Sequence, residues 1–138
     1  MTFCLDSTII VPEKNEDIKN AIILLHGYGG DGKDISMLCN NWKRHMPNTV
    51  FICPNGHEPC PISPSGYQWF DLTRDDPEYI IEQSLKAEKK LNQFLEEIKK
   101  MYKLENNKIC LSGFSQGCMM SINICLLYTS PSPRDKRQ

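Results

Sequence analysis

Apolar residues follow two different patterns along this chain, and the two patterns alternate. Continuous apolar runs over Ala21–Leu25, Val50–Cys53 and Ile109–Leu111 are typical of strands covered on both faces. Ser7–Val11 predicts a further strand at the edge of the sheet, ended by Pro12. Between the runs, apolar residues recur every three or four positions, as in amphipathic helices. The alternation of strand and helix predicts an α/β fold with a mostly parallel sheet and flanking helices.

Two helices have recognisable ends. Asp34 is a good N-cap for the first, which should run to Met46 because Pro47 stops it. Its expected inward residues are Ile35, Leu38, Trp42 and His45 or Met46. The second begins at Asp76 with Pro77 in its first position. Its apolar stripe, which we expect to pack on the sheet rather than bind a partner, consists of Ile80, Ser84, Ala87, Leu91, Phe94, Ile98 and Met101.

Length, composition and charge narrow the function classes. The 138 residues suffice for one domain, and 40% hydrophobic with 24% charged residues is ordinary for a soluble globular protein. A formal net charge of -1 gives no reason to expect nucleic acid as a partner. No apolar stretch approaches the roughly 20 residues that span a bilayer, so stable membrane insertion is not expected. The first six residues lack a secretory signal, which favours a cytoplasmic location.

The seven cysteines form no regular framework, which favours reduced thiols buried as small hydrophobic groups. Five lie in or beside apolar runs: Cys39, Cys53, Cys110, Cys118 and Cys125. Cys53, His57 and Cys60 are close enough in sequence to suggest a metal site, but a fourth ligand is lacking. We therefore expect a plain loop there, with neither a metal nor a Cys53–Cys60 disulfide.

The sequence Gly-Phe-Ser-Gln-Gly over 113–117 carries the strongest chemical signal. It stands between a predicted strand over 108–112 and an apolar helical run over 118–122. A serine on such a sharp strand-to-helix turn exposes its Oγ above the sheet, and the flanking glycines let strand and helix approach. Ser115 is therefore a candidate nucleophile.

A serine that attacks a carbonyl also needs donors for the oxyanion that forms. The backbone N–H of Gln116, at the start of the following helix, is one candidate. The glycine-rich loop over 26–32 is expected to supply the second. That loop could instead hold a phosphate or a dinucleotide, but its glycines do not give the spacing of either motif. No cofactor is therefore expected.

Three segments resemble the phospholipase/carboxylesterase family of α/β-hydrolases, which includes the acyl-protein thioesterases. They are Leu-Leu-His-Gly-Tyr-Gly-Gly-Asp-Gly over 24–32, Gly-Tyr-Gln-Trp-Phe-Asp over 66–71 and Gly-Phe-Ser-Gln-Gly over 113–117. They occur in the family's order, and the resemblance extends over roughly residues 7 to 125. It implies a hydrolase that needs no metal or cofactor and acts on a small-molecule or acyl-protein ester. Carboxylesterase, lysophospholipase and thioesterase activities all fit this class.

The resemblance also implies roles for individual residues. Ser115 would be the nucleophile, and the backbone amides of Tyr28 and Gln116 would form the oxyanion hole. Trp69 would lie near the acyl pocket, although a half-buried anchor for its loop is an equally good interpretation. His26 would shape the oxyanion loop rather than act as the base.

The chain departs from the family after the serine. In α/β-hydrolases an acid and then a histidine follow the nucleophile, yet the 23 residues after Ser115 contain no histidine. We therefore expect 1–125 to be the N-terminal part of a truncated α/β-hydrolase domain. Residues 126–138 would form a disordered tail without evolved function. The apolar strand at 109–111 would then be left at an open edge.

Three hypotheses about function remain. The parent protein is expected to be a serine hydrolase for esters or thioesters, with this chain inactive or nearly so. The alternative is a non-catalytic α/β binding module, in which 113–117 is only a tight turn. A third possibility takes His26 or His57 as a base within the chain. The sequence predicts no oligomeric state.

Overall fold

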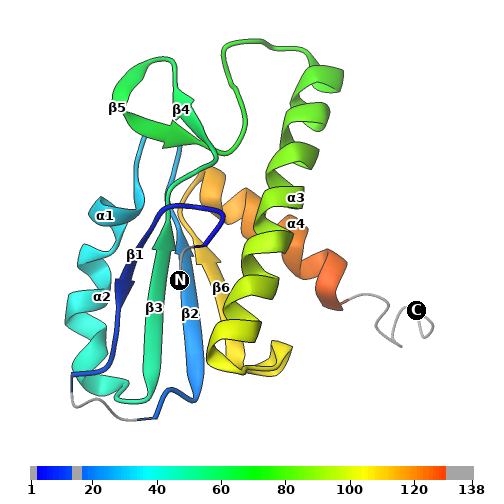
Figure 1. Ribbon diagram of the computed structural model, residues 1–138. Helices are drawn as coiled ribbons and strands as arrows, with labels where there is room; N and C mark the ends of the chain where they lie inside the picture. The colour runs from blue at the N-terminus through cyan, green and yellow to red at the C-terminus, as the bar shows by residue number, and fades with distance from the viewer. Residues whose placement is uncertain (1–2, 14–16, 130–138) are drawn as a thin grey trace.

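A four-stranded sheet forms the centre of the computed structural model, which describes residues 3–13 and 17–129, with side chains up to 125 (Figure 1). The strand order is β1–β3–β2–β6. The strands are β1 (Ser7–Ile10), β2 (Asn20–Leu25), β3 (Thr49–Pro54) and β6 (Ile109–Gly113). β2, β3 and β6 run parallel, and β1 pairs with β3 antiparallel. The predicted α/β fold with a mostly parallel sheet is confirmed.

The register of the sheet brings together the loops that follow β2 and β6. Leu25, the last residue of β2, lies opposite Gly113, the last residue of β6. Because the two strands are parallel, the loops that follow them leave the same edge of the sheet. β3, on the other side of β2, is buried at all six positions, as its continuous apolar run predicts.

One face of the sheet is covered by α3 (Pro77–Tyr102) and α4 (Gln116–Thr129). The Asp76 side chain accepts hydrogen bonds from the amides of Glu78 and Tyr79, so the predicted cap of α3 is confirmed. α3 buries the middle of the predicted stripe, at Ala87, Leu91, Phe94 and Ile98, but the prediction is wrong at Met101, which is 39% exposed. α4 adds Met120 and Ile124 to the same core.

The opposite face is covered by two short helices where one long helix was predicted. α1 spans Gly32–Ile35 and α2 spans Met37–Trp42, followed by the 3-10 turn η1 at Lys43–His45. Asp31, not Asp34, caps α1. The break at Ser36 changes which residues face inward, because Cys39 is fully buried while Leu38 is 47% exposed. The predicted inward stripe is therefore wrong at Leu38 and also at Trp42, which is 40% exposed.

A hairpin that the sequence did not predict lies beyond the carboxyl edge of the sheet (Figure 1). It consists of β4 (Glu58–Cys60) and β5 (Ser63–Gln68), which pair antiparallel. The segment expected to be a plain loop thus contains a strand, β4. A second 3-10 turn, η2 (Asn106–Lys108), leads into the amino end of β6, at the end of the sheet away from the hairpin.

β6 is an edge strand, since β2 is its one neighbour in the described part of the chain. Cys110 on β6 and Cys118 and Cys125 on α4 are exposed, so the prediction that these thiols are buried is wrong. Cys39 and Cys53 are buried as predicted, with their Sγ atoms 3.9 Å apart.

The expected boundary at residue 125 falls inside α4, which continues to Thr129. Most of the tail expected to be disordered, 130–138, lies outside the described residues. No helix within residues 3–13 and 17–129 has the length and apolar character needed to cross a bilayer.

Candidate active site

Ser115 sits at the turn between β6 and α4 in a left-handed backbone conformation, with φ of 56°. Such a conformation costs an L-residue about 1–2 kcal/mol. The neighbouring glycines make the turn possible. A Cβ on Gly113 would lie 2.3 Å from the carbonyl carbon of Gly117, and one on Gly117 would lie 2.3 Å from the Leu25 oxygen. The geometry is that of a nucleophile elbow.

Hydrogen bonds fix the elbow against the end of β2. The Phe114 amide donates to the Leu25 carbonyl at 3.0 Å, and the Gly117 amide donates to the Phe114 carbonyl at 3.0 Å. The Met119 amide closes the first turn of α4 on the Ser115 carbonyl at 3.1 Å. Ser115 itself is exposed. The backbone is therefore held firmly while the hydroxyl-bearing residue stays open to a ligand.

The loop after β2 lies directly beside this serine. A Cβ built on Gly27 would be 3.3 Å from the Cβ of Ser115, so the loop passes at van der Waals distance. The Tyr28 and Gln116 amides, one on each side of this contact, donate to no acceptor among residues 3–13 and 17–129. The Gln116 amide also stands at the positive end of α4. Two free N–H groups beside an exposed serine can stabilise an oxyanion.

The hairpin holds this loop in place. The Gly29 amide donates to the Tyr67 carbonyl at 2.9 Å, and the Tyr67 amide donates to the Gly30 carbonyl at 2.8 Å. The Ser63 hydroxyl adds a bond to the Gly29 carbonyl at 3.2 Å. The loop thus extends the ladder of β5, which orders its amides before any substrate binds.

His26 is a structural residue in this arrangement. Its Nε2 accepts a hydrogen bond from the Gly56 amide at 2.8 Å, so its Nδ1 carries the proton and donates to the Gly27 carbonyl at 2.6 Å. Burial lowers its pKa, which keeps the ring neutral. With both nitrogens engaged, His26 has no lone pair available for the Ser115 hydroxyl.

Trp69 is fully buried, and its indole N–H donates to the His26 carbonyl at 2.9 Å. Its ring stacks on the imidazole of His26 with 5.1 Å between centroids. These contacts are those of an anchor for the loop, although a completely buried one rather than the half-buried one considered from the sequence. The role of Trp69 at an acyl pocket stays a prediction.

The Gln116 side chain has a role that the sequence did not suggest. Its Oε1 accepts from the amides of Trp69 and Phe70 at 2.8 and 3.4 Å, and its Nε2 donates to the Phe70 carbonyl at 2.8 Å. These bonds join α4 to a loop 46–47 residues earlier in the chain. Gln116 thereby connects the elbow to the loop that supports His26. A single sequence offers no signal for this contact.

The other titratable groups belong to separate surroundings. His57 lies near Glu58, with 3.9 Å between its Nε2 and the carboxylate, and burial lowers its pKa. His45, on η1, accepts from Arg44 at the opposite edge of the sheet. Asp71 accepts from the Thr73 amide and hydroxyl and from the Tyr79 hydroxyl, and these bonds, led by the amide, lower its pKa. None of these contacts involves Ser115.

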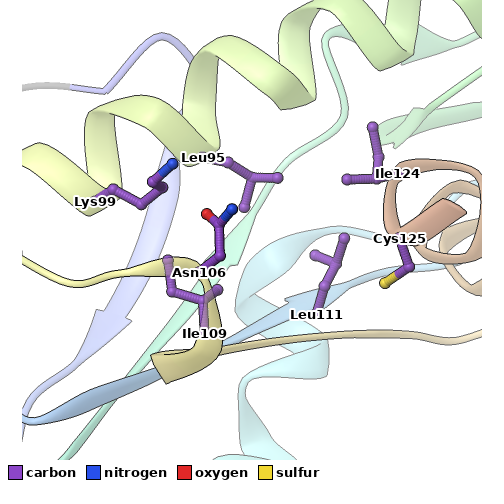
Figure 2. Close-up of a pocket in the computed structure, with 7 residues that line it drawn as sticks. All are labelled: Leu95, Lys99, Asn106, Ile109, Leu111, Ile124 and Cys125. Atoms are coloured by element: carbon purple, nitrogen blue, oxygen red, sulfur yellow. The ribbon is translucent and has the colours of Figure 1, made fainter. Parts of the chain in front are cut away.

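Two cavities differ in their relation to this site. A groove of about 360 Å³ adjoins the loop after β2 and is also lined by α1, α2 and Phe114. A smaller cavity of about 130 Å³ lies between α3, β6 and α4, with Leu95, Leu111 and Ile124 around it (Figure 2). The smaller one contains no candidate site residue and is a gap in apolar packing at the open edge.

The described ranges hold no cluster of three His, Cys, Asp or Glu side chains that could bind a metal ion. The thiols of Cys53 and Cys60 are both free, and Cys53 contacts Cys39 instead. Of the three residues singled out from the sequence, Cys53 lies on β3, Cys60 lies on β4 and His57 lies in the bend before β4.

Known proteins resemble the chain in sequence and structure. A sequence model of the phospholipase/carboxylesterase family matches residues 6–134. Acyl-protein thioesterase 1 of Schizosaccharomyces pombe is 29% identical over 136 residues, which cover 93% of this chain and 58% of that protein. The crystal structure of esterase PE8 superposes with a TM-score of 0.81 at 34% identity, covering 88% of this chain and 57% of the esterase.

A carboxylesterase from Mesorhizobium loti shares the fold, with a TM-score of 0.63 at 24% identity over 82% of this chain and 50% of that one. The chain thus spans between half and three fifths of the length of the relatives it matches.

Proposed function

The chain belongs to the phospholipase/carboxylesterase family of α/β-hydrolases, and from this premise we propose that it carries the nucleophile and oxyanion hole of a serine hydrolase for carboxylic esters or thioesters. The observation that carries the proposal is the strained, exposed Ser115 beside two free backbone amides. Strain of this kind persists where the surrounding structure enforces it, and it clusters at functional sites.

In the proposed reaction the Ser115 hydroxyl adds to the carbonyl carbon of the ester or thioester. The negative charge that develops on the carbonyl oxygen is bound by the N–H groups of Tyr28 and Gln116. The alcohol or thiol leaves with the proton that the serine lost, and an acyl-serine remains. Water then adds to the acyl-serine, releases the carboxylic acid and returns the proton to Ser115.

The proton must pass through a general base, which we propose is a histidine supplied by polypeptide outside this sequence. His26, His45 and His57 all have other contacts, as described above. An acid that orients the base would come from the same source. Without them, the oxyanion hole and substrate binding alone provide about 10³–10⁴-fold acceleration over water in other serine hydrolases.

A chemical-rescue experiment tests this proposal on the chain itself. The chain is treated with p-nitrophenyl acetate, with and without added imidazole, and acylated residues are located by peptide mass spectrometry. We expect acetylation of Ser115 to rise with imidazole concentration, because free imidazole replaces the missing base. Ser115→Ala is the matched control and should show only the background reaction of imidazole with the ester.

The rival hypothesis, a non-catalytic α/β binding module, predicts a different result. In that case Ser115 is no more reactive than other exposed serines, and imidazole changes the wild type and Ser115→Ala equally. Acylation that needs no imidazole and disappears in His57→Ala would instead support a base within the chain.

A further inference from the structure

We infer that the groove beside the loop after β2 binds an apolar part of the substrate and favours a positively charged group on its polar side. This inference rests on the proposed function, because it assigns the groove to the substrate of Ser115. The groove has a volume of about 360 Å³, which lies within the range of small-molecule sites.

Three side chains give the groove its apolar walls. Ile35 and Leu38 contribute from α1 and α2, and Phe114 contributes from the residue before the nucleophile. Leu38 and Phe114 are 47% and 69% exposed. Leaving such apolar surface in water carries a free-energy cost that an apolar ligand would remove.

The groove lies next to Ser115, because residues that flank the serine line it. Phe114 precedes Ser115, and its Cδ2 lies 3.3 Å from a Cβ built on Gly27. Gly27 and Tyr28 belong both to the groove and to the loop beside the serine. A chain attached to a carbonyl carbon at Ser115 can therefore enter the groove directly.

The break between α1 and α2 creates this surface. The Ser36 hydroxyl donates to the Lys33 carbonyl at 2.6 Å, and α2 then starts at Met37. With this break, Cys39 is buried and Leu38 lines the groove. A continuous helix with Leu38 facing the sheet, as the sequence predicted, would have removed this wall.

The polar side of the groove is negatively charged. Asp31 and Asp34 both line it, and no lysine or arginine lines it in the described part of the chain. Asp31 is held in place because its Oδ1 accepts from the Asp34 amide at 2.7 Å. Two carboxylates without a basic partner along the lining attract a cation and repel an anion. A ligand with an apolar chain and a cationic end matches both features.

Binding of two simple amphiphiles tests the inference without relying on turnover. Octyltrimethylammonium and octanoate have similar apolar chains and opposite charges, and their affinities can be measured by NMR titration. We expect the cation to bind about three- to tenfold more tightly than the anion, because exposed charge pairs are individually weak. The preference should decrease as salt is added.

Two groove variants and one control test whether the binding preference arises in the groove. Asp34→Asn should reduce the preference for the cation to about two- to threefold. Glu105→Gln makes the same charge change before the amino end of β6, away from the groove, and should leave the preference unchanged. Leu38→Ser should weaken both amphiphiles by a similar factor. Equal affinity for octanoate, or an Asp34→Asn variant that behaves like Glu105→Gln, would overturn the inference.

The apolar chain could belong to the acyl group or to the leaving group. Reaction of Ser115 with an octyl fluorophosphonate, with imidazole added as the base that this chain lacks, distinguishes the two. If the adduct blocks octyltrimethylammonium binding, the acyl side occupies the groove. If binding persists, the leaving group does.

The outcomes separate this inference from the proposed function. Ser115→Ala should bind both amphiphiles like the wild type, because the serine is not among the groove's lining residues. A cation preference without acylation of Ser115 would remove the proposed function and leave a binding groove. Acylation of Ser115 without a cation preference would remove the inference alone.

Discussion

Ser115 combines an unfavourable backbone conformation with an exposed position. Glycine adopts positive φ without a Cβ clash, so Ser115→Gly should remove the strain. We predict that Ser115→Gly raises the free energy of unfolding by up to about 1 kcal/mol. Urea denaturation measures this directly. Ser115→Ala keeps a Cβ and should not be stabilised, and equal values for the two variants would show that the conformation stores no strain.

The Gln116 side chain joins the start of α4 to the loop at Trp69 and Phe70. Gln116→Leu keeps the amide but leaves the amides of Trp69 and Phe70 and the Phe70 carbonyl without a partner. An unsatisfied buried polar group costs about 1–3 kcal/mol, and we predict a destabilisation of at least that size. Gln93→Leu, an exposed glutamine on α3, provides the control for unfolding measurements.

The buried histidines make stability depend on pH. Burial lowers the pKa of His26 and of His57, so the unfolded chain binds more protons than the folded chain once pH falls below about 7. Stability should therefore decrease from about pH 7 to about pH 5. This window lies above the range in which Asp71, whose pKa is lowered, begins to titrate.

The variant His57→Leu isolates the contribution of His57 to this pH dependence of stability. Neither ring nitrogen of His57 has a hydrogen-bond partner within the described ranges, so the variant loses no such bond. It should be at least as stable as the wild type near neutral pH and should lose less stability on acidification. His45→Leu, at an exposed position, should follow the wild-type pH dependence. Parallel curves for all three proteins would contradict the prediction.

At the scale of elements, the approach of α4 to β2 determines where Ser115 lies. A Cβ on Gly117 would meet the Leu25 and His26 carbonyl oxygens at 2.3 and 2.6 Å, and neither backbone group can move alone. We predict that Gly117→Ala costs about 3 kcal/mol or more, the upper end for an overpacked site. Gly27→Ala, whose added Cβ would have its nearest contacts at 3.3 Å, should destabilise the fold clearly less. Thermal unfolding of both variants measures the difference.

The elements that could be predicted from sequence have long, uniform patterns. β2, β3 and α3 follow from continuous apolar runs and from a capped amphipathic stripe. The β4–β5 hairpin could not be predicted, because Pro59 and Pro64 interrupt any alternation and the hairpin bonds to the loop after β2, more than 30 residues away. The first helix was predicted wrongly because it breaks at Ser36. The Ser36 hydroxyl donates to the Lys33 carbonyl at this break, and the spacing of apolar residues does not indicate such a bond.

The candidate site likewise has one part that the sequence predicts and another part that it does not. The spacing of the glycines around Ser115 carries information about a local turn, and the elbow appears as the motif predicts. The hydrogen bonds of the Gln116 side chain join residues 46–47 positions apart. The tautomer of His26 depends on its bond with the Gly56 amide, 30 positions away. Such contacts exist only after folding, so a single sequence does not reveal them.

At the scale of the whole molecule, the sheet ends at a strand that exposes apolar surface. Met119 and Ile122 of α4 are 56% and 54% exposed, and Ile122 shares a hollow with Leu111 of β6 at the open edge. Unpaired edges with apolar neighbours favour association. We predict that the chain self-associates in a concentration-dependent manner, and that Ile122→Lys reduces this association in sedimentation velocity experiments. Val11→Lys, the same charge change at a residue that is 55% exposed directly after β1, the opposite edge strand, should have a smaller effect.

The central claim is that Ser115 is a nucleophile positioned beside an oxyanion hole but without a base in this chain. Imidazole-dependent acetylation of Ser115, mapped by mass spectrometry after exposure to p-nitrophenyl acetate, tests it most directly. The account predicts a modified peptide that contains Ser115, whose yield rises with imidazole and which is absent in Ser115→Ala. Acetylation spread over other residues, with no dependence on Ser115, would contradict it.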